Sequence, residues 1–174
     1  MTTTRPLKSL SIAGLLIGLI LPVSIAVGAQ TAQAATLTFT DPSGDTSRAG
    51  LDLVNATLDN ADYTASIDIN FKAHKSGTTV VGLRARGRGT LRIANLHDAD
   101  GRDRTFLLNN SGRIACDGLS ANWREKSAAL HIEVPSSCLW QGNYGAIRPW
   151  LLTEGLKSGS DVDYAATDTW TPRG

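Results

Sequence analysis

Apolar and polar residues alternate with a period of two along most of the chain beyond residue 35. In residues 62–71, DYTASIDINF, the alternation puts one apolar set on a single strand face: Tyr63, Ala65, Ile67, Ile69 and Phe71. Residues 129–134, ALHIEV, repeat the pattern with Leu130, Ile132 and Val134 on one face. This alternation is typical of strands with one buried face.

The same alternation, separated by clusters of Gly, Asp, Asn and Ser, predicts strands at residues 36–39, 51–58, 62–71, 78–87, 89–96, 104–110, 129–134, 146–153 and 163–170. Within residues 51–58 the apolar phase shifts from odd to even positions, which predicts a β-bulge. Pro149 should lie at an edge or an irregular point of its strand. No segment carries a helical apolar stripe over three turns. The chain therefore predicts an all-β fold, an antiparallel β-sandwich (jelly-roll or immunoglobulin-like) of about eight or nine strands.

The first residues are typical of a secretory signal peptide. Arg5 and Lys8 precede an uncharged apolar run at residues 10–29, and small residues at 32–34 follow it. We expect cleavage after Ala34, which leaves residues 35–174 as one secreted domain with no membrane attachment. An uncleaved anchor is the alternative, since the run is long enough to span a bilayer, but Pro22 and the small-residue exit favour cleavage.

The net charge of this domain argues against two kinds of partner, nucleic acids and membranes. The chain has 17 Lys and Arg against 16 Asp and Glu, and removal of Arg5 and Lys8 leaves 15 against 16, a net charge of −1. Without an overall electrostatic field to attract a polyanion or a lipid surface, we expect neither a nucleic acid nor a membrane as partner. We also expect the domain to be a monomer.

The two cysteines, Cys116 and Cys138, both lie in the exported part. An oxidising compartment favours a disulfide between them, and a loop of this size stabilises a fold by about 3 kcal/mol in the chain-entropy model. Two free buried thiols are the alternative.

Two acidic corners offer the hard oxygen ligands that calcium prefers. They are residues 41–52, with Asp41, Asp45 and Asp52 around Pro42 and Gly44, and residues 97–104, with Asp98, Asp100 and Asp103 around Gly101. Neither spacing matches a known calcium loop. The alternative is a structural corner, in which Asp side chains bond their own backbone.

Arginines and tryptophans supply two further binding hypotheses. Arg84, Arg86, Arg88 and Arg92 occupy even positions and share a strand face, which could bind an anionic polymer or be only a solvated outer face. Trp123, Trp140, Trp150 and Trp170 all lie in the last third of the chain. We assign Trp150 to the core, whereas Trp123 and Trp140 flank the cysteines and could form a sugar-stacking platform or pack inside.

Catalytic motifs are absent from the sequence. Glu133 with Asp98 or Glu154 could form the carboxylate pair of a secreted hydrolase, but any β protein offers such pairs. We therefore expect a non-catalytic binding or interaction module, with a hydrolase as an alternative.

Residues 41–45 (DPSGD), 51–53 (LDL), the acidic turn at 98–103, CDGL at 116–119 and VPSSCL at 134–139 together resemble a group of small secreted proteins of Gram-positive bacteria. The resemblance covers nearly all of the exported part. It implies a sandwich similar to DOMON-type and family-9-like carbohydrate-binding domains, in which calcium or sugar sites occur. It also supports the bond between Cys116 and Cys138, and a role for Asp41, Gly44 and Asp45 in fixing a corner. The resemblance assigns no function, since sandwiches serve unrelated functions; a calcium-stabilised module that binds a cell-wall or extracellular glycan is the alternative to a general binding or interaction module.

Overall fold

The computed structural model describes residues 34–42, 44–46, 51–155 and 161–174. All of them belong to one compact unit, Ala32–Gly174. Residues 1–33 of the predicted signal peptide lie outside the described residues, so this expectation stays a prediction. Among the described residues, no helix has the length and apolar character needed to span a bilayer.

The described residues form short strands joined mostly by tight turns. The strands are β1 (Ala35–Thr40), β2 (Leu53–Asn60), β3 (Thr64–Phe71), β4 (Gly77–Ala85), β5 (Leu91–His97), β6 (Asp103–Asn109), β7 (Gly112–Ile114), β8 (Ser120–Arg124), β9 (Ala129–Pro135), β10 (Ile147–Glu154) and β11 (Asp163–Ala166). Three single 3-10 turns accompany them: η1 (Glu125–Ser127), η2 (Ser136–Cys138) and η3 (Trp140–Gly142). Each strand predicted from the alternation is present, and β7 and β8 are additional.

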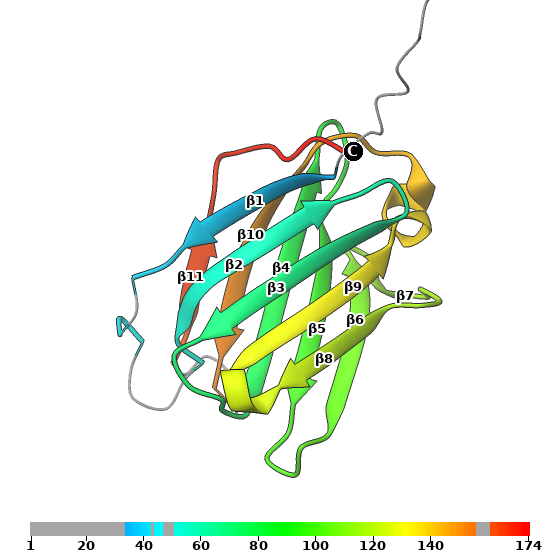
Figure 1. Ribbon diagram of the computed structural model, residues 1–174. Coiled ribbons are helices and arrows are strands. Elements are labelled where there is room, and N and C mark those ends of the chain that lie inside the picture. The colour runs from blue at the N-terminus through cyan, green and yellow to red at the C-terminus, as the bar shows by residue number, and fades with distance from the viewer. Residues whose placement is uncertain (1–33, 43, 47–50, 156–160) are drawn as a thin grey trace, which may run out of the picture. The chain divides into compact units, whose positions relative to one another are not determined.

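The strands pair into two antiparallel sheets that pack face to face, as Figure 1 shows. The five-stranded sheet has the order β1-β2-β3-β9-β8, and the six-stranded sheet has the order β11-β10-β4-β5-β6-β7. The predicted antiparallel β-sandwich is therefore confirmed. Segments distant in the sequence, such as β4 and β10, become neighbours in this topology, which decides which side chains can act together.

The core lies between the sheets. Leu58, Ile67 and Ile132 of the five-stranded sheet and Leu83 and Ile93 of the six-stranded sheet are fully buried. Burying an aliphatic side chain of this size stabilises a fold by about 1.5–3 kcal/mol. The inward faces predicted for β3 and β9 are therefore confirmed.

The predicted inward position of Tyr63 is wrong. Tyr63 is 85% exposed, because the alternating run begins one residue later, at Thr64. The backbone N–H of Ala61 donates to the carbonyl of Thr64, so Tyr63 lies in the turn that precedes β3.

The two predicted irregularities are present. The pairing of β2 with β3 shifts between Leu53 and Asn55, which confirms the bulge. Pro149 lies in β10, between the last β11 pair at Trp150 and the isolated bridge that joins Ile147 to Thr171. No strand pairs with Pro149 on that side within the described residues, so its missing N–H breaks no ladder there.

Candidate functional site

A pocket of about 610 Å³ lies at one end of the sandwich, and we call it the Trp140 pocket. It is formed where the turns β4–β5 and β6–β7 meet η2 and η3. Arg88 comes from the first turn, Asn109 from the end of β6, Asn110 from the second turn, and Trp140 and Gln141 from η3. This volume lies within the usual range of small-molecule sites.

The indole ring of Trp140 is held in place without any ligand. Its Nε1–H donates to the carbonyl of Gly89 at 2.9 Å, and its ring centre lies 5.6 Å from that of Tyr144 at a tilt of 52°. Trp140 is half-buried and contributes to the pocket wall. Because the ring is fixed beforehand, stacking on it would lose little side-chain entropy.

The backbone at the pocket is strained. Trp140 (φ 49°) and Gln141 (φ 59°) are consecutive non-glycine residues in the left-handed region, and Gly142 follows at φ 76°. Arg173 supports this turn by donating from Nη1 to the carbonyl of Gly142 at 2.8 Å. Strain of this kind concentrates at functional sites, where the surrounding structure maintains it.

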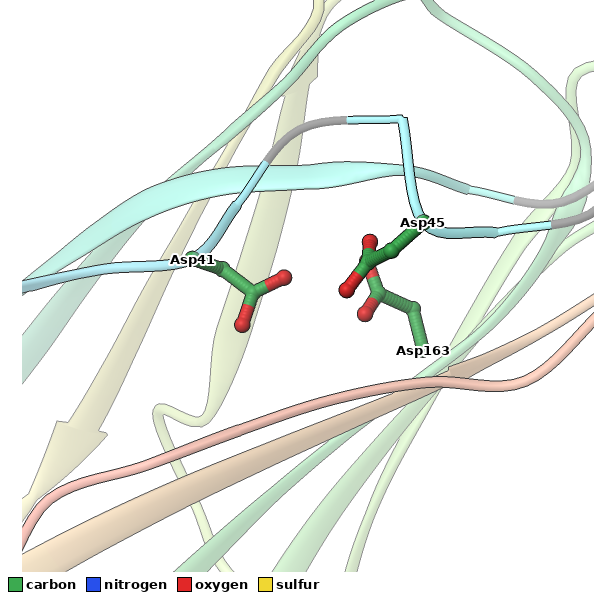
Figure 2. A group of neighbouring side chains, drawn as sticks. All are labelled: Asp41, Asp45 and Asp163. Carbon is green, nitrogen blue, oxygen red and sulfur yellow. The ribbon is translucent and has the colours of Figure 1, made fainter.

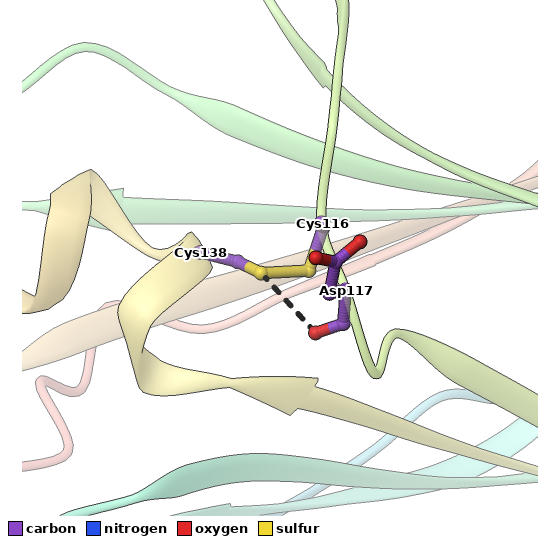
Figure 3. The surroundings of a disulfide bond; sticks show 3 residues. All are labelled: Cys116, Asp117 and Cys138. Atoms are coloured by element: carbon purple, nitrogen blue, oxygen red, sulfur yellow. Dashed lines mark hydrogen bonds between the residues drawn. A yellow bond between two sulfur atoms is a disulfide. The ribbon is translucent and has the colours of Figure 1, made fainter.

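The predicted disulfide between Cys116 and Cys138 is confirmed, with an S–S distance of 2.06 Å and a Cα–Cα distance of 5.4 Å. Figure 3 shows that it ties the 3-10 turn η2 to the segment that follows β7, and Sγ of Cys138 lies 4.0 Å from the carbonyl oxygen of Asp117. Cys138 and Ala115 both line the Trp140 pocket. The bond therefore fixes two walls of the pocket against each other.

The pocket can form hydrogen bonds with a polar ligand and offers the Trp140 ring to an apolar face. Asn109, Asn110, Gln141 and Ser111 offer amide and hydroxyl groups that can donate and accept hydrogen bonds. Arg88 contributes a positive charge, and none of the described residues that line the pocket is a carboxylate.

The first acidic corner brings together three carboxylates. Figure 2 shows Asp41 and Asp45, from the loop after β1, pointing toward Asp163 at the start of β11, and one oxygen from each lies within 4.8 Å of the others. Asp163 is 4% exposed, and it accepts hydrogen bonds from the backbone N–H groups of Leu53 (2.7 Å) and Tyr164 (2.8 Å). The sequence did not indicate Asp163, because it lies more than a hundred residues from the loop.

Asp41 is the unsatisfied member of this group. Its Oδ2 is buried and has no hydrogen-bond partner among the described residues. Burial, followed by the charge of Asp163, raises the pKa of Asp41 from its ordinary 3.8 to about 6, and the charges of Asp45 and Asp52 add to this effect. A group of three carboxylates, one of them with such an oxygen, fits the ligand preference of calcium.

Asp52 and the second acidic corner have partners of their own. Asp52 accepts a hydrogen bond from the N–H of Gly44 at 3.0 Å and lies 3.5 Å from Nζ of Lys72, so it fixes the corner. The other three residues are paired with bases near their own turn: Asp98 with Arg104 (3.3 Å), Asp100 with Arg102 (2.7 Å) and Asp103 with His97 (2.8 Å). Asp98, Asp100 and Asp103 of the second corner are not part of the group of carboxylates around Asp41.

Trp123 and Trp150 differ in position. Trp123 stacks on Phe71, with ring centres 5.1 Å apart, and its Nε1–H donates to Oδ1 of Asn95 at 3.0 Å. Trp123 is thus packed beside the core and does not line the Trp140 pocket. The assignment of Trp150 to the core is wrong, since its neighbours Pro149 and Leu151 point inward and Trp150 lies half-buried on the outer face of the six-stranded sheet.

The predicted arginines lie at three locations. Arg84 lies on the outer face of β4, opposite Arg148 of β10, and the exposed Arg86 lies just beyond the end of β4. Arg88 lines the Trp140 pocket, and Arg92 is half-buried in β5.

The carboxylates considered for hydrolysis belong to different sheets. Glu133 lies in β9 of the five-stranded sheet, where Oε1 is 3.4 Å from Nε2 of His131. Glu154 ends β10, and Asp98 follows β5, both in the six-stranded sheet. None of the three lines the Trp140 pocket.

Comparisons of the chain with protein families, with curated proteins and with solved structures found no match. The fold and the geometry of these sites therefore carry the functional argument.

Proposed function

We propose that this protein is a secreted, non-catalytic carbohydrate-binding module that acts outside the cell or at the cell envelope, and that the Trp140 pocket is its sugar site. The observation that carries the proposal is the position of Trp140, a half-buried indole fixed beside a pocket lined by amide and hydroxyl groups. A sugar ring has an apolar C–H face that stacks on an indole and hydroxyl groups around its edge. The pocket offers both kinds of contact.

The strained turn at Trp140 and Gln141 also favours binding over a purely structural role. A glycine at position 141 would adopt the same backbone at lower cost. The exposed Gln141 side chain lines the pocket, so a ligand contact gives a reason for keeping it there.

Export is supported by three features. The first residues match a signal peptide, the disulfide between Cys116 and Cys138 suits an oxidising compartment, and the sequence resembles small secreted bacterial proteins. The candidate ligands of an exported protein of this kind are soluble extracellular glycans and the polysaccharides of the envelope.

Calcium has a structural role in this proposal. Asp41, Asp45 and Asp163 would hold the ion, joining the loop after β1 to β11. The buried, unpartnered Oδ2 of Asp41 supports this assignment, because a cation would satisfy that oxygen and offset the repulsion among the three carboxylates. The acidic corner and the Trp140 pocket share no residue, so calcium would stabilise the fold rather than contact the sugar.

Calorimetric titration with a panel of neutral oligosaccharides tests the sugar site. Asn110→Ala removes one exposed amide from the pocket, and we expect it to weaken binding about fivefold to tenfold, since one hydrogen bond contributes about 1 kcal/mol. Asn143→Ala, at an exposed asparagine that does not line the pocket, is the matched control and should leave affinity unchanged.

Trp140→Ala should abolish measurable binding, and Trp140→Phe should retain part of it because a ring remains. Binding that survives Trp140→Ala at full strength would contradict the proposal, as would a panel in which no neutral sugar binds.

A further inference from the structure

A second surface lies on the outer face of the six-stranded sheet, where arginines and aromatic rings from three separate parts of the chain meet. We call it the arginine–aromatic strip. It consists of Arg84 and Arg86 from β4 and its end, Arg148 and Trp150 from β10, Tyr164 from β11, and Trp170 from the C-terminal segment.

Two like charges face each other at its centre. Arg84 lies directly opposite Arg148 in the pairing of β4 with β10. Like charges at opposed positions destabilise a sheet. Arg148 is paired with Asp168 at 3.0 Å, but no carboxylate among the described residues lies within ion-pair distance of Arg84 or Arg86. At Arg84 and Arg86 the strip therefore keeps positive charge that none of the described carboxylates neutralises.

The aromatic part of the strip is built on a glycine. A Cβ at Gly82 would lie 1.8 Å from Cε2 of Trp150, so the ring occupies the space directly over the β4 backbone that a side chain would fill. The ring of Tyr164, which is 55% exposed, lies 6.2 Å away at a tilt of 36°. The two rings form a shallow aromatic surface beside Arg84 and Arg148.

Trp170 extends this surface toward the end of the sheet. The guanidinium carbon of Arg86 lies 5.2 Å from the centre of the Trp170 ring, and that of Arg148 lies 5.1 Å from it. Both distances suit cation–π contacts, which fix the guanidinium groups without neutralising them. Aromatic rings and arginines from separate parts of the chain thus lie beside one another on this surface.

We propose that the arginine–aromatic strip binds an acidic polysaccharide, a polymer of sugar rings with a carboxylate or sulfate on some of them. Arg84 and Arg148 would bind the anionic group in the bidentate geometry that guanidinium favours. Trp150 and Tyr164 would stack on the adjoining rings. A shallow depression of about 90 Å³ lies between Arg84, Arg148, Trp150, Tyr164 and Asp168, and the edge of one sugar ring would contact it.

A carboxylate at the strip favours this ligand over a nucleic acid. Asp168 lines the same depression. Its oxygens accept hydrogen bonds from hydroxyl groups, which an acidic polysaccharide carries on every ring and which single-stranded DNA lacks along its chain.

The strip does not depend on the sugar site at Trp140. The residues that line the depression and those that line the Trp140 pocket do not overlap, and Arg88 belongs to the pocket. The two proposals can therefore fail separately.

Binding of the purified protein to polygalacturonate, to a neutral polysaccharide such as dextran and to a single-stranded oligodeoxythymidine tests the strip, at low and at high salt. Polygalacturonate should bind most tightly, with affinity that falls as salt rises. Arg84→Gln should weaken it about tenfold, because a hydrogen bond between charged groups is lost. Tyr164→Ala should weaken it as well, whereas Arg102→Gln, an equally charged change in the turn after β5, should have no effect.

Three results would overturn the inference. Arg84→Gln could bind polygalacturonate as tightly as the wild type, dextran could bind the Trp140→Ala variant as tightly as polygalacturonate does, or the oligodeoxythymidine could bind more tightly than both polymers. Neutral oligosaccharides measured in parallel with Trp140→Ala report on the proposed function, which none of these three results addresses.

Discussion

The disulfide gives the sharpest quantitative prediction, because its cost can be worked from the chain. Cys116 and Cys138 are 22 residues apart. The chain-entropy model for a loop of that length gives a loss of about 3 kcal/mol in the free energy of unfolding when the bond is removed. A domain of this size is stable by about 5–15 kcal/mol, so the double variant Cys116→Ala/Cys138→Ala should remain folded at 25 °C.

Removal of the disulfide should also weaken neutral-sugar binding in the Trp140 pocket, since Cys138 and Ala115 form two of its walls. Urea denaturation of the wild type and of the double variant measures the stability, and calorimetry with the best neutral sugar measures the pocket. Reduction of the wild type with dithiothreitol should reproduce the stability change. A difference below about 1 kcal/mol, with unchanged sugar affinity, would refute the reasoning.

Three further predictions concern single positions. Gly82→Ala should destabilise the protein by about 1–3 kcal/mol and weaken polygalacturonate binding, because the new Cβ displaces the Trp150 ring; urea denaturation and binding assays check it. Gln141→Gly should leave stability unchanged or raise it, since it relieves the left-handed strain, yet weaken neutral-sugar binding; a parallel loss of stability would contradict the strain argument. Without calcium, the raised pKa of Asp41 means that the folded state binds more protons than the unfolded state between pH 4 and about 6. Stability should therefore fall as the pH rises through about 6, and thermal melts should show that calcium restores it at pH 7 but not at pH 5; equal melts with calcium and with chelator at pH 7 would remove the metal.

The fold could be predicted because alternation is a local signal. The inward faces of β3 and β9, the bulge in β2 and the place of Pro149 all follow from residue order alone. The alternation does not predict β7 and β8, because these strands are short and their sequences, GRI and SANWR, contain too few alternating apolar and polar residues. Trp150 lies between the apolar residues Pro149 and Leu151, which favours a core assignment, but the phase of its strand places it on the outer face.

The candidate sites could be predicted only in part, because they depend on long-range pairing. Trp140, Arg88 and the two cysteines were visible as residue types. Asp163 joins the first acidic corner from the far end of the chain, and the left-handed backbone at Gln141 leaves no trace in the sequence. The same limit applies to the arginines, whose aromatic neighbours come from other strands.

The four indole N–H groups allow the most direct test of sugar binding in the Trp140 pocket. In a nitrogen–proton correlation spectrum, the indole signal of Trp140 should shift when a neutral oligosaccharide is added, because its N–H bonds to Gly89 at the pocket edge. The signal of Trp123, which is bonded to Asn95 beside the core, should stay in place. A spectrum in which every sugar tested leaves the Trp140 signal unmoved would contradict the claim that this sandwich binds carbohydrate in the Trp140 pocket.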